Sequence, residues 1–395
     1  MNLDFSDDQK FLQEEARKFL EKEDSLNRSR GVLDTKGKVD QELWDKIVEL
    51  GWTGIRIPEE YGGLGLSHLE LCVIAEELGR YLAPVPFSSS VYLFTEAIVK
   101  YANEEVKKDI LPKLISGECV GTLAVTEDLF APTELNIKTS TSNNITTGKK
   151  IAVPDAEIAT HSIVISKSDE GINLRLIDHS HESVTIKHQE TIDESRGHFS
   201  VECVETPSIL IGDESNGWEL YESIIDQAAV LFSFEQIGGS QASLDMSIDY
   251  AKERYAFGRP IGSFQAIKHK LADMYVAITL AKSNSYYAAW ALSSESSDLA
   301  TASATARVSA TKAYQLCSKE NIQTHGGNGY TWEYDCHLYY KRSKLLSVNI
   351  GSLTNWKEKL DANQASKHAW SPLHKACKNA DTEIFSVFLE RSGWW

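Results

Sequence analysis

The stretch RYAFGRPIGSFQAIKHKLADMY, residues 254–275, joins two segments of different kinds. It opens with a tight basic turn shaped by Gly258 and Pro260, and an amphipathic run begins at Phe264. The residues before it, 216–253, carry helical periodicity through almost their whole length. The sequence therefore predicts a long helix, a basic turn and a second, half-buried helix.

Helical patterns also extend to either side of this stretch. Residues 264–293 and 298–324 are predicted to form two long helices, and the second is rich in Ala and Ser, which allows close packing. Residues 1–118 show the same periodicity, and their first helix is expected to begin at a Ser6 cap. The apolar stripe of that helix consists of Phe11, Leu12, Ala16, Phe19 and Leu20.

A different pattern separates the two helical regions. From about residue 119 to 212 the chain consists of short β-branched runs, such as THSIVISKS and INLRLIDH, broken by Asn, Gly, Asp and Ser. Evenly spaced strands of this kind are typical of a small antiparallel barrel or sandwich. We therefore expect an α+β fold in four parts: an N-terminal all-helical domain at 1–118, a middle antiparallel β domain at 119–215, a C-terminal helical bundle at 216–362, and a tail of open role at 363–395.

The bulk composition narrows the class of protein. The chain has 395 residues and a net charge of −17, which argues against general nucleic-acid binding because that requires a basic surface. Its six cysteines form no CxxC pair, and no cluster of His, Cys and Asp has metal-site spacing, so we expect reduced thiols and no metal. The N-terminus lacks the layout of a signal peptide, and no run reaches the roughly 18 apolar residues of a membrane span. These features predict a cytoplasmic protein without a membrane span.

Three motifs carry a resemblance to a known family. They are LAVTE at 123–127, YAKERYAFGRPIGSFQAIKHKLADM at 250–274 and IQTHGGNGYTWEYD at 322–335. With the order helices, strands, helices, they resemble the acyl-CoA dehydrogenase family from about residue 3 to 360. The sequences of these motifs are most similar to those of the bacterial branch that acts on bulky or unusual acyl-CoAs. The resemblance implies a middle β-barrel or sandwich domain and a C-terminal four-helix bundle.

The resemblance also implies that the opening stretch binds FAD. Arg254 would place its planar, permanently charged guanidinium on the pyrophosphate. The Gly-rich QTHGG run would reach the adenine end of the FAD bound by a neighbouring subunit, where backbone without side chains can approach closely. Two subunits would then build each site, so a homodimer or tetramer is expected. The candidate cofactor-binding residues are Val125, Thr126, Arg254, Phe257, Gln265, Gln323, Gly326 and Gly327.

The family's reaction is α,β-dehydrogenation, in which a carboxylate removes the α-proton of an acyl-CoA thioester while the β-hydrogen leaves as hydride to the flavin. The resemblance implies two usual positions for the catalytic glutamate, and this chain has Ala228 at one and Ile350 at the other. Glu235 lies about two helical turns after Ala228 on nearly the same face, in an otherwise apolar segment. It is either a structural, ion-paired carboxylate or the catalytic base at a shifted position. Gly351 is the candidate substrate contact.

The middle domain departs from the family pattern in two places. Residues 128–134 read DLFAPTE where the family usually has Pro-Gly-x-Gly-Ser, a loop that wraps flavin and substrate. Ala152 stands where a tryptophan commonly covers the flavin ring. These differences indicate a roomier or remodelled pocket, or a subunit whose site no longer works.

Three functions follow from these residues. The first is an FAD-dependent acyl-CoA dehydrogenase that forms a trans-2-enoyl-CoA, uses Glu235 as base and passes electrons to an electron-transfer flavoprotein. The second is a catalytically impaired subunit that pairs with a paralogous partner in a heteromeric enzyme. The third is a flavin oxidase or monooxygenase on the same fold, which needs no such glutamate. Bleaching of the flavin by an acyl-CoA without oxygen separates the first from the others.

Overall fold

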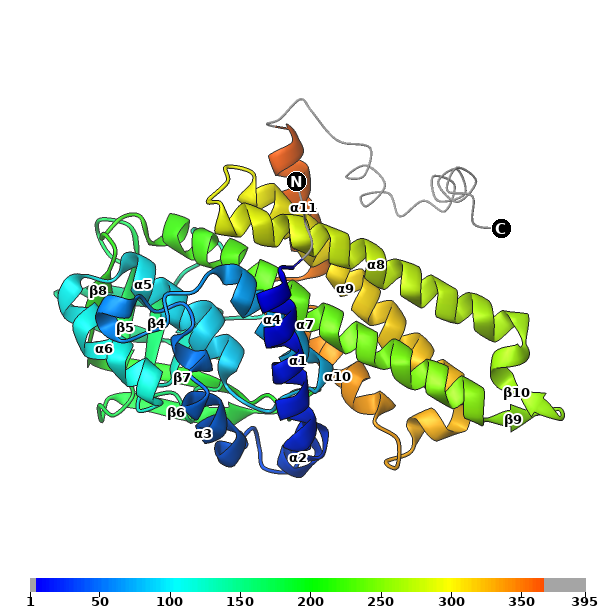
Figure 1. The fold of residues 1–395 in the computed structure, drawn as a ribbon. Helices are drawn as coiled ribbons and strands as arrows, with labels where there is room; N and C mark the ends of the chain where they lie inside the picture. The colour runs from blue at the N-terminus through cyan, green and yellow to red at the C-terminus, as the bar shows by residue number, and fades with distance from the viewer. Residues whose placement is uncertain (1–4, 366–395) are drawn as a thin grey trace.

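The computed structural model describes residues 5–365. An N-terminal group of helices, a β-sheet domain and a C-terminal group of long helices follow one another along the chain (Figure 1). The α+β fold expected from the sequence is therefore confirmed. Residues 366–395 of the expected tail lie outside the described residues, and 363–365 complete the last helix, α11 (Leu353–Ala365).

The N-terminal region is helical, as its periodicity predicts. The first helix, α1 (Asp7–Lys22), begins at Ser6, which forms a reciprocal capping box with Gln9. Ala16 and Leu20 of the predicted stripe are buried, whereas Phe11 is 64% exposed. The remaining elements are α2 (Ser25–Val32), α3 (Gln41–Glu49), the 3₁₀ turns η1 (Trp52–Gly54) and η2 (Glu59–Tyr61), α4 (His68–Arg80), the π-helix η3 (Ser88–Thr95), α5 (Glu96–Tyr101) and α6 (Glu104–Ser116).

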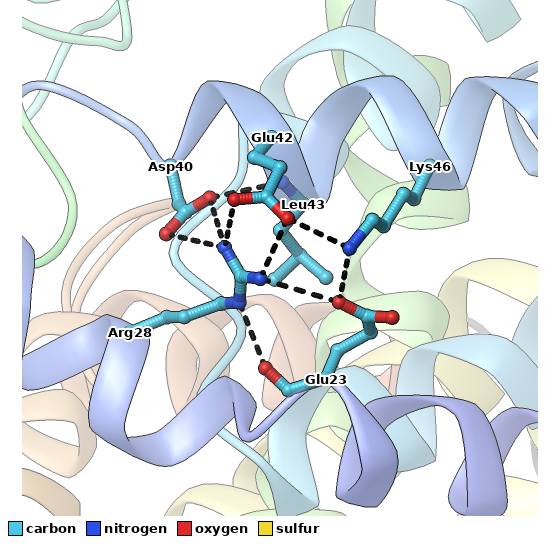
Figure 2. Close-up of polar contacts among 6 residues, drawn as sticks. All are labelled: Glu23, Arg28, Asp40, Glu42, Leu43 and Lys46. Carbon is cyan, nitrogen blue, oxygen red and sulfur yellow. Dashed lines mark hydrogen bonds and ion pairs between the residues drawn. The ribbon is translucent and has the colours of Figure 1, made fainter.

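A cluster of charged side chains joins α2 to α3 (Figure 2). Arg28 of α2 donates hydrogen bonds to Asp40, Glu42 and Glu23, and Lys46 of α3 donates to Glu23 and Glu42. The two cations lower the pKa of the Glu42 carboxyl to about 2, and the hydrogen bond from Arg28 has the largest effect. Asp40 also caps α3 by accepting a hydrogen bond from the backbone N–H of Leu43 at 2.9 Å. The cluster therefore fixes the start of α3 against α2.

The middle domain contains an eight-stranded sheet. Seven strands follow the order β6-β7-β3-β2-β4-β5-β8, and β1 pairs with β4. Most pairs are antiparallel, as the sequence predicts, but β1 and β2 each pair with β4 in parallel. The strands are β1 (Gly121–Ala124), β2 (Ser140–Ser142), β3 (Ile145–Pro154), β4 (His161–Lys167), β5 (Ile172–Asp178), β6 (Val184–Gln189), β7 (His198–Pro207) and β8 (Ile209–Ile211).

Three long helices dominate the C-terminal region. They are α7 (Gly217–Glu253), α8 (Gln265–Ser293) and α9 (Leu299–His325), which agree closely with the predicted spans. The basic turn between α7 and α8 forms a small hairpin of β9 (Tyr255–Ala256) and β10 (Arg259–Pro260) at the end of the long helices away from the sheet (Figure 1). The 3₁₀ turns η4 (Ile261–Ser263) and η5 (Gly326–Tyr330), α10 (Cys336–Leu346) and α11 complete the region. In the part of the chain that the structure describes, no helix has the length and apolar character needed to cross a membrane.

The N-terminal and C-terminal helices meet where α4 crosses α7. A Cβ atom on Gly79 would lie 2.0 Å from the carbonyl oxygen of Glu235, and one on Gly238 would lie 1.8 Å from that of Glu76. Both distances are far below van der Waals contact, so only glycine permits this approach of the two backbones. The middle of α7, which includes Glu235, is therefore buried against α4.

Candidate active site

Glu235 is a buried carboxylate on α7, with 3% of its surface exposed. Its Oε1 atom lies 3.5 Å from Nη1 of Arg196 and 3.6 Å from Nη1 of Arg342. Arg196 belongs to the loop between β6 and β7, and Arg342 belongs to α10. The candidate base is therefore ion-paired with two arginines that come from different domains.

Each of these arginines also has a second acidic neighbour. The Nε atom of Arg342 donates to Oδ2 of Asp193 at 2.6 Å, and its Nη2 donates to Ser195 at 2.9 Å. Arg196 lies 3.7 Å from Oδ2 of Asp155. Burial raises the pKa of the Asp193 carboxyl, but Arg342 and the hydrogen bonds from Ser195 together hold this pKa below its usual range. The carboxylates and guanidinium groups thus form one buried network between the sheet domain and the C-terminal helices.

A third arginine completes the network from α9. Arg307 is 1% exposed, and its Nη2 donates to the carbonyl of Leu346 and, at 2.7 Å, to Oδ1 of Asn349. Burial lowers the pKa of the Arg307 guanidinium, and the nearby charge of Glu235 opposes that shift. Because Asn349 precedes Ile350, Arg307 connects the surroundings of Glu235 to the loop that carries one of the two usual glutamate positions.

Apolar side chains occupy both of those usual positions. Ala228 is fully buried in α7, and Ile350 is 8% exposed. The backbone around Ile350 is tightly held, since its carbonyl accepts a hydrogen bond from Nε1 of Trp356 at 3.1 Å. Gly351, the candidate substrate contact, has a φ of +104°, a conformation that favours glycine.

Most of the candidate FAD residues lie at the far end of the long helices. Tyr250 near the end of α7 stacks on His325 at the end of α9, with 4.1 Å between ring centroids, and also accepts a hydrogen bond from Asn328 at 3.1 Å. The segments that follow these two helix ends are therefore neighbours in one chain. The ends of α7 and α9, with the segments that follow them, carry six of the eight candidates: Arg254, Phe257, Gln265, Gln323, Gly326 and Gly327.

These six residues present a surface that fits a phosphate-bearing group. Arg254 is exposed, and Phe257 is 96% exposed at a φ of +52°. A Cβ atom added to Gly326 or Gly327 would meet nothing within 4 Å, so their backbone is open to a ligand or to another chain. The exposed guanidinium is suited to a pyrophosphate, and the space around the two glycines would let a cofactor bound by a second subunit approach their backbone.

The other two cofactor candidates, Val125 and Thr126, lie just after β1. Their carbonyl groups accept hydrogen bonds from Lys150 Nζ at 3.1 Å and from the N–H of Ile151 at 2.7 Å. Both residues are half-buried, and Val125 borders a small hollow beside the loop at 128–137. Thus these two candidates lie on the sheet domain, separate from the six at the end of the long helices.

Sequence reasoning missed the arginines around Glu235. Arg196, Arg307 and Arg342 are distant from one another in sequence, and only the fold brings them to one carboxylate. The available signal was weak: Arg307 interrupts an Ala- and Ser-rich helix, where a charged residue needs a buried partner. In the described part of the chain, no group of three or more His, Cys, Asp and Glu side chains could hold a metal ion.

Comparison with known proteins identifies the family. Models of the N-terminal and C-terminal domains of acyl-CoA dehydrogenases match residues 6–118 and 215–353. The acyl-CoA dehydrogenase IpdE2 of Mycobacterium tuberculosis is 30% identical over 338 residues, which covers 85% of this chain and 91% of the relative. The chain therefore belongs to the acyl-CoA dehydrogenase family.

Two further relatives support this assignment. The probable acyl-CoA dehydrogenase YngJ of Bacillus subtilis is 29% identical over 369 residues, covering 89% of this chain and 96% of the relative. A solved variant of the steroid ACAD Tcur3481-Tcur3483 superposes with a TM-score of 0.82 at 26% identity, covering 91% of this chain and 99% of that chain. The resemblance found in the sequence is thus confirmed at the level of the family.

Proposed function

We propose that the chain is an FAD-dependent acyl-CoA dehydrogenase that converts an acyl-CoA thioester to the trans-2-enoyl-CoA with Glu235 as the catalytic base. The observation that carries the proposal is the position of Glu235: a buried carboxylate that is ion-paired to Arg196 and Arg342. Membership of the family supports the reaction class.

The roles of the side chains follow from their chemistry. An oxygen of Glu235 takes the α-proton of the thioester, and exclusion of water from the buried site strengthens each charge interaction there. Arg254 would bind the pyrophosphate of the cofactor, and the backbone of Gly326 and Gly327 would approach the adenine end of the cofactor bound by a neighbouring subunit. When bound, FAD supplies the acceptor for the β-hydride. An electron-transfer flavoprotein is the expected acceptor for the reduced enzyme, and the chain acts as a homo-oligomer or beside a paralogous subunit.

The first prediction concerns Glu235→Gln, which keeps the shape of the side chain but removes its ability to accept a proton. We expect the purified protein to retain FAD and its flavin spectrum, while anaerobic bleaching by acyl-CoAs falls by at least about a thousandfold. Wild type is tested against short, long, branched and ring-bearing acyl-CoAs, with flavin absorbance as the readout.

Glu96→Gln is the matched control. Glu96 is also 3% exposed and is paired with an arginine, Arg56, at 3.2 Å, but it lies on α5 outside the Glu235 network. Its substitution should leave bleaching in place. Unchanged bleaching in Glu235→Gln would remove Glu235 from the mechanism.

A specific observation favours a second function, that of a partner subunit in a heteromeric enzyme. Both usual glutamate positions are apolar, and the remaining acid is engaged by two arginines. The steroid ACAD that shares the fold is described under two component names, Tcur3481-Tcur3483, which suits a two-chain enzyme. In that case the purified chain shows no bleaching with any acyl-CoA, and activity appears only after co-expression with a homologous chain. Oxygen consumption without anaerobic bleaching would instead indicate a flavin oxidase or monooxygenase.

A further inference from the structure

Several buried donors on side chains near Glu235 make no hydrogen bond. They are Nε of Arg196, Nε and Nη1 of Arg307, Nη1 of Arg342 and the hydroxyls of Tyr92 and Tyr314. Each of these side chains is at most 7% exposed, and each interacts electrostatically with Glu235. Because most buried polar atoms in proteins are hydrogen-bonded, so many unpaired donors around one carboxylate indicate that an acceptor belongs there.

The hydrogen bonds of Arg307 show which of its donors remain unpaired. Two neutral oxygens, from Leu346 and Asn349, accept from Nη2 of this guanidinium. The Nε and Nη1 groups are left without a partner. Tyr314 projects its ring over α7, where a Cβ on Gly239 would lie 2.4 Å from its hydroxyl oxygen. Tyr314 thus packs on α7 one turn after Glu235, and the Arg307 guanidinium lies 5.7 Å from the centre of the Phe232 ring, about one turn before Glu235.

The charge balance of the network indicates what kind of acceptor fits. Three guanidinium groups, of Arg196, Arg307 and Arg342, are matched by three carboxylates, of Asp155, Asp193 and Glu235. A further anion would leave an uncompensated negative charge in a buried site, which is strongly unfavourable. A neutral oxygen accepts hydrogen bonds without disturbing this balance.

We propose that these donors bind a neutral oxygen, a carbonyl or a hydroxyl, on the acyl group of the substrate. The substrate class is then an acyl-CoA that carries an oxygen function beyond its thioester. This inference rests on the proposed function, in which Glu235 meets the α-carbon. Because the unpaired donors lie on side chains adjacent to that carboxylate, the oxygen belongs a few bonds beyond the β-carbon.

The test compares three ligands of similar size on the full-length protein with FAD bound. Hexanoyl-CoA has no additional oxygen, 5-oxohexanoyl-CoA has a neutral carbonyl, and adipoyl-CoA has a carboxylate. Calorimetry measures binding, and anaerobic flavin bleaching measures the reaction. We expect 5-oxohexanoyl-CoA to bind at least about tenfold more tightly than hexanoyl-CoA, from one or two additional hydrogen bonds. Adipoyl-CoA should have no such advantage.

Variants then assign the preference to the site. Tyr314→Phe and Tyr92→Phe each remove one unpaired hydroxyl with little change in volume, and each should reduce the preference for the oxo ligand several-fold. Tyr339→Phe is the control, since Tyr339 is also buried but its hydroxyl already donates to the carbonyl of Arg80 at 2.7 Å. It should leave the preference unchanged.

The outcomes separate this inference from the proposed function. Equal binding of the hexanoyl and oxo ligands would overturn the inference and mean that the donors hold only water, whether or not bleaching occurs. Tightest binding by adipoyl-CoA would overturn the assignment to a neutral oxygen. A preference for the oxo ligand without bleaching by any acyl-CoA would support the site and reject catalysis by this chain alone.

Discussion

Lys150 is a lysine buried within a β-strand, and its ammonium group holds the segment that carries two cofactor candidates. Its Nζ donates to Oε1 of Glu127 at 2.7 Å and to the carbonyl of Val125 at 3.1 Å. Glu127 in turn accepts hydrogen bonds from the backbone N–H groups of Lys138 and Thr139. The Glu127 carboxylate therefore closes the loop between residues 127 and 139, and Lys150 holds both that carboxylate and the backbone at Val125.

The titration of Lys150 gives a prediction at the scale of one residue. Burial lowers its pKa to about 8, and the hydrogen bond that Lys150 donates to Glu127 only partly offsets this effect. The pKa of a lysine in the unfolded chain is about 10.4. Between the folded and unfolded pKa values, the unfolded chain therefore binds more protons than the folded one. As pH rises through this window, Lys150 should therefore increase the free energy of unfolding.

Urea unfolding between pH 7 and 10 measures this effect. We expect the stability of wild type relative to Lys150→Met to rise with pH across the window. Lys149→Met removes the same charge from the exposed neighbouring position and serves as the control, for which the difference from wild type should stay flat. Parallel curves for wild type and Lys150→Met would show that Lys150 keeps its proton throughout.

At the scale of elements, the crossing of α4 and α7 depends on glycine. A methyl group at Gly238 would meet the carbonyl oxygen of Glu76 at 1.8 Å, and a backbone carbonyl cannot rotate away as a flexible side chain can. We therefore expect Gly238→Ala to destabilise the fold by about 3 kcal/mol or more, despite the better helix propensity of alanine.

A glycine-to-alanine substitution in α2 should have the opposite effect on stability. Gly31 is exposed, and a Cβ there would meet no atom within 4 Å, so Gly31→Ala should stabilise the protein by about 0.5–1 kcal/mol. Thermal and urea unfolding of the two variants check both values. If Gly238→Ala were as stable as wild type, α4 and α7 would have to lie further apart than this structure has them.

The sequence predicted elements better than it predicted their pairing. The periodicity of residues 216–253 gave the bounds of α7 to within one residue at its start, because a long helix repeats its signal many times. By contrast, the parallel pairing of β1 with β4 joins strands that are about 40 residues apart, and no local pattern encodes it. Likewise, the apolar stripe predicted for α1 includes Phe11, but the structure leaves the Phe11 side chain 64% exposed.

The site shows the same limit. Glu235 stood out because a carboxylate interrupts an apolar helix, which local sequence reveals. Its partners Arg196 and Arg342 did not stand out. They come from other elements, and in the sequence alone each resembles a surface arginine. The glycine-rich segment at 326–327 was singled out only by resemblance to a family, and its assignment to FAD stays a prediction.

At the scale of the whole molecule, buried ion pairs connect the sheet domain to the C-terminal helices. Asp193, in the loop between β6 and β7, is 2% exposed, and Arg342 of α10 is 1% exposed. Their side chains meet at 2.6 Å, and Ser195 adds a second contact to the same guanidinium. Because the two partners are contributed by different domains, the pair resists separation of those domains as well as unfolding.

A double-mutant cycle on this pair gives the last prediction. Arg342→Met leaves the Asp193 carboxylate buried without its partner, and Asp193→Leu leaves the buried guanidinium with only the more distant Glu235, so each should cost about 3–5 kcal/mol of unfolding free energy. The double variant removes both charges and should cost clearly less than the sum of the two single changes. The exposed pair of Lys113 and Asp109, 2.6 Å apart on α6, is the control, with a coupling energy below about 1 kcal/mol. If the two buried substitutions were simply additive under urea unfolding, then the ion pair would not couple the domains, and their junction would depend on apolar packing alone.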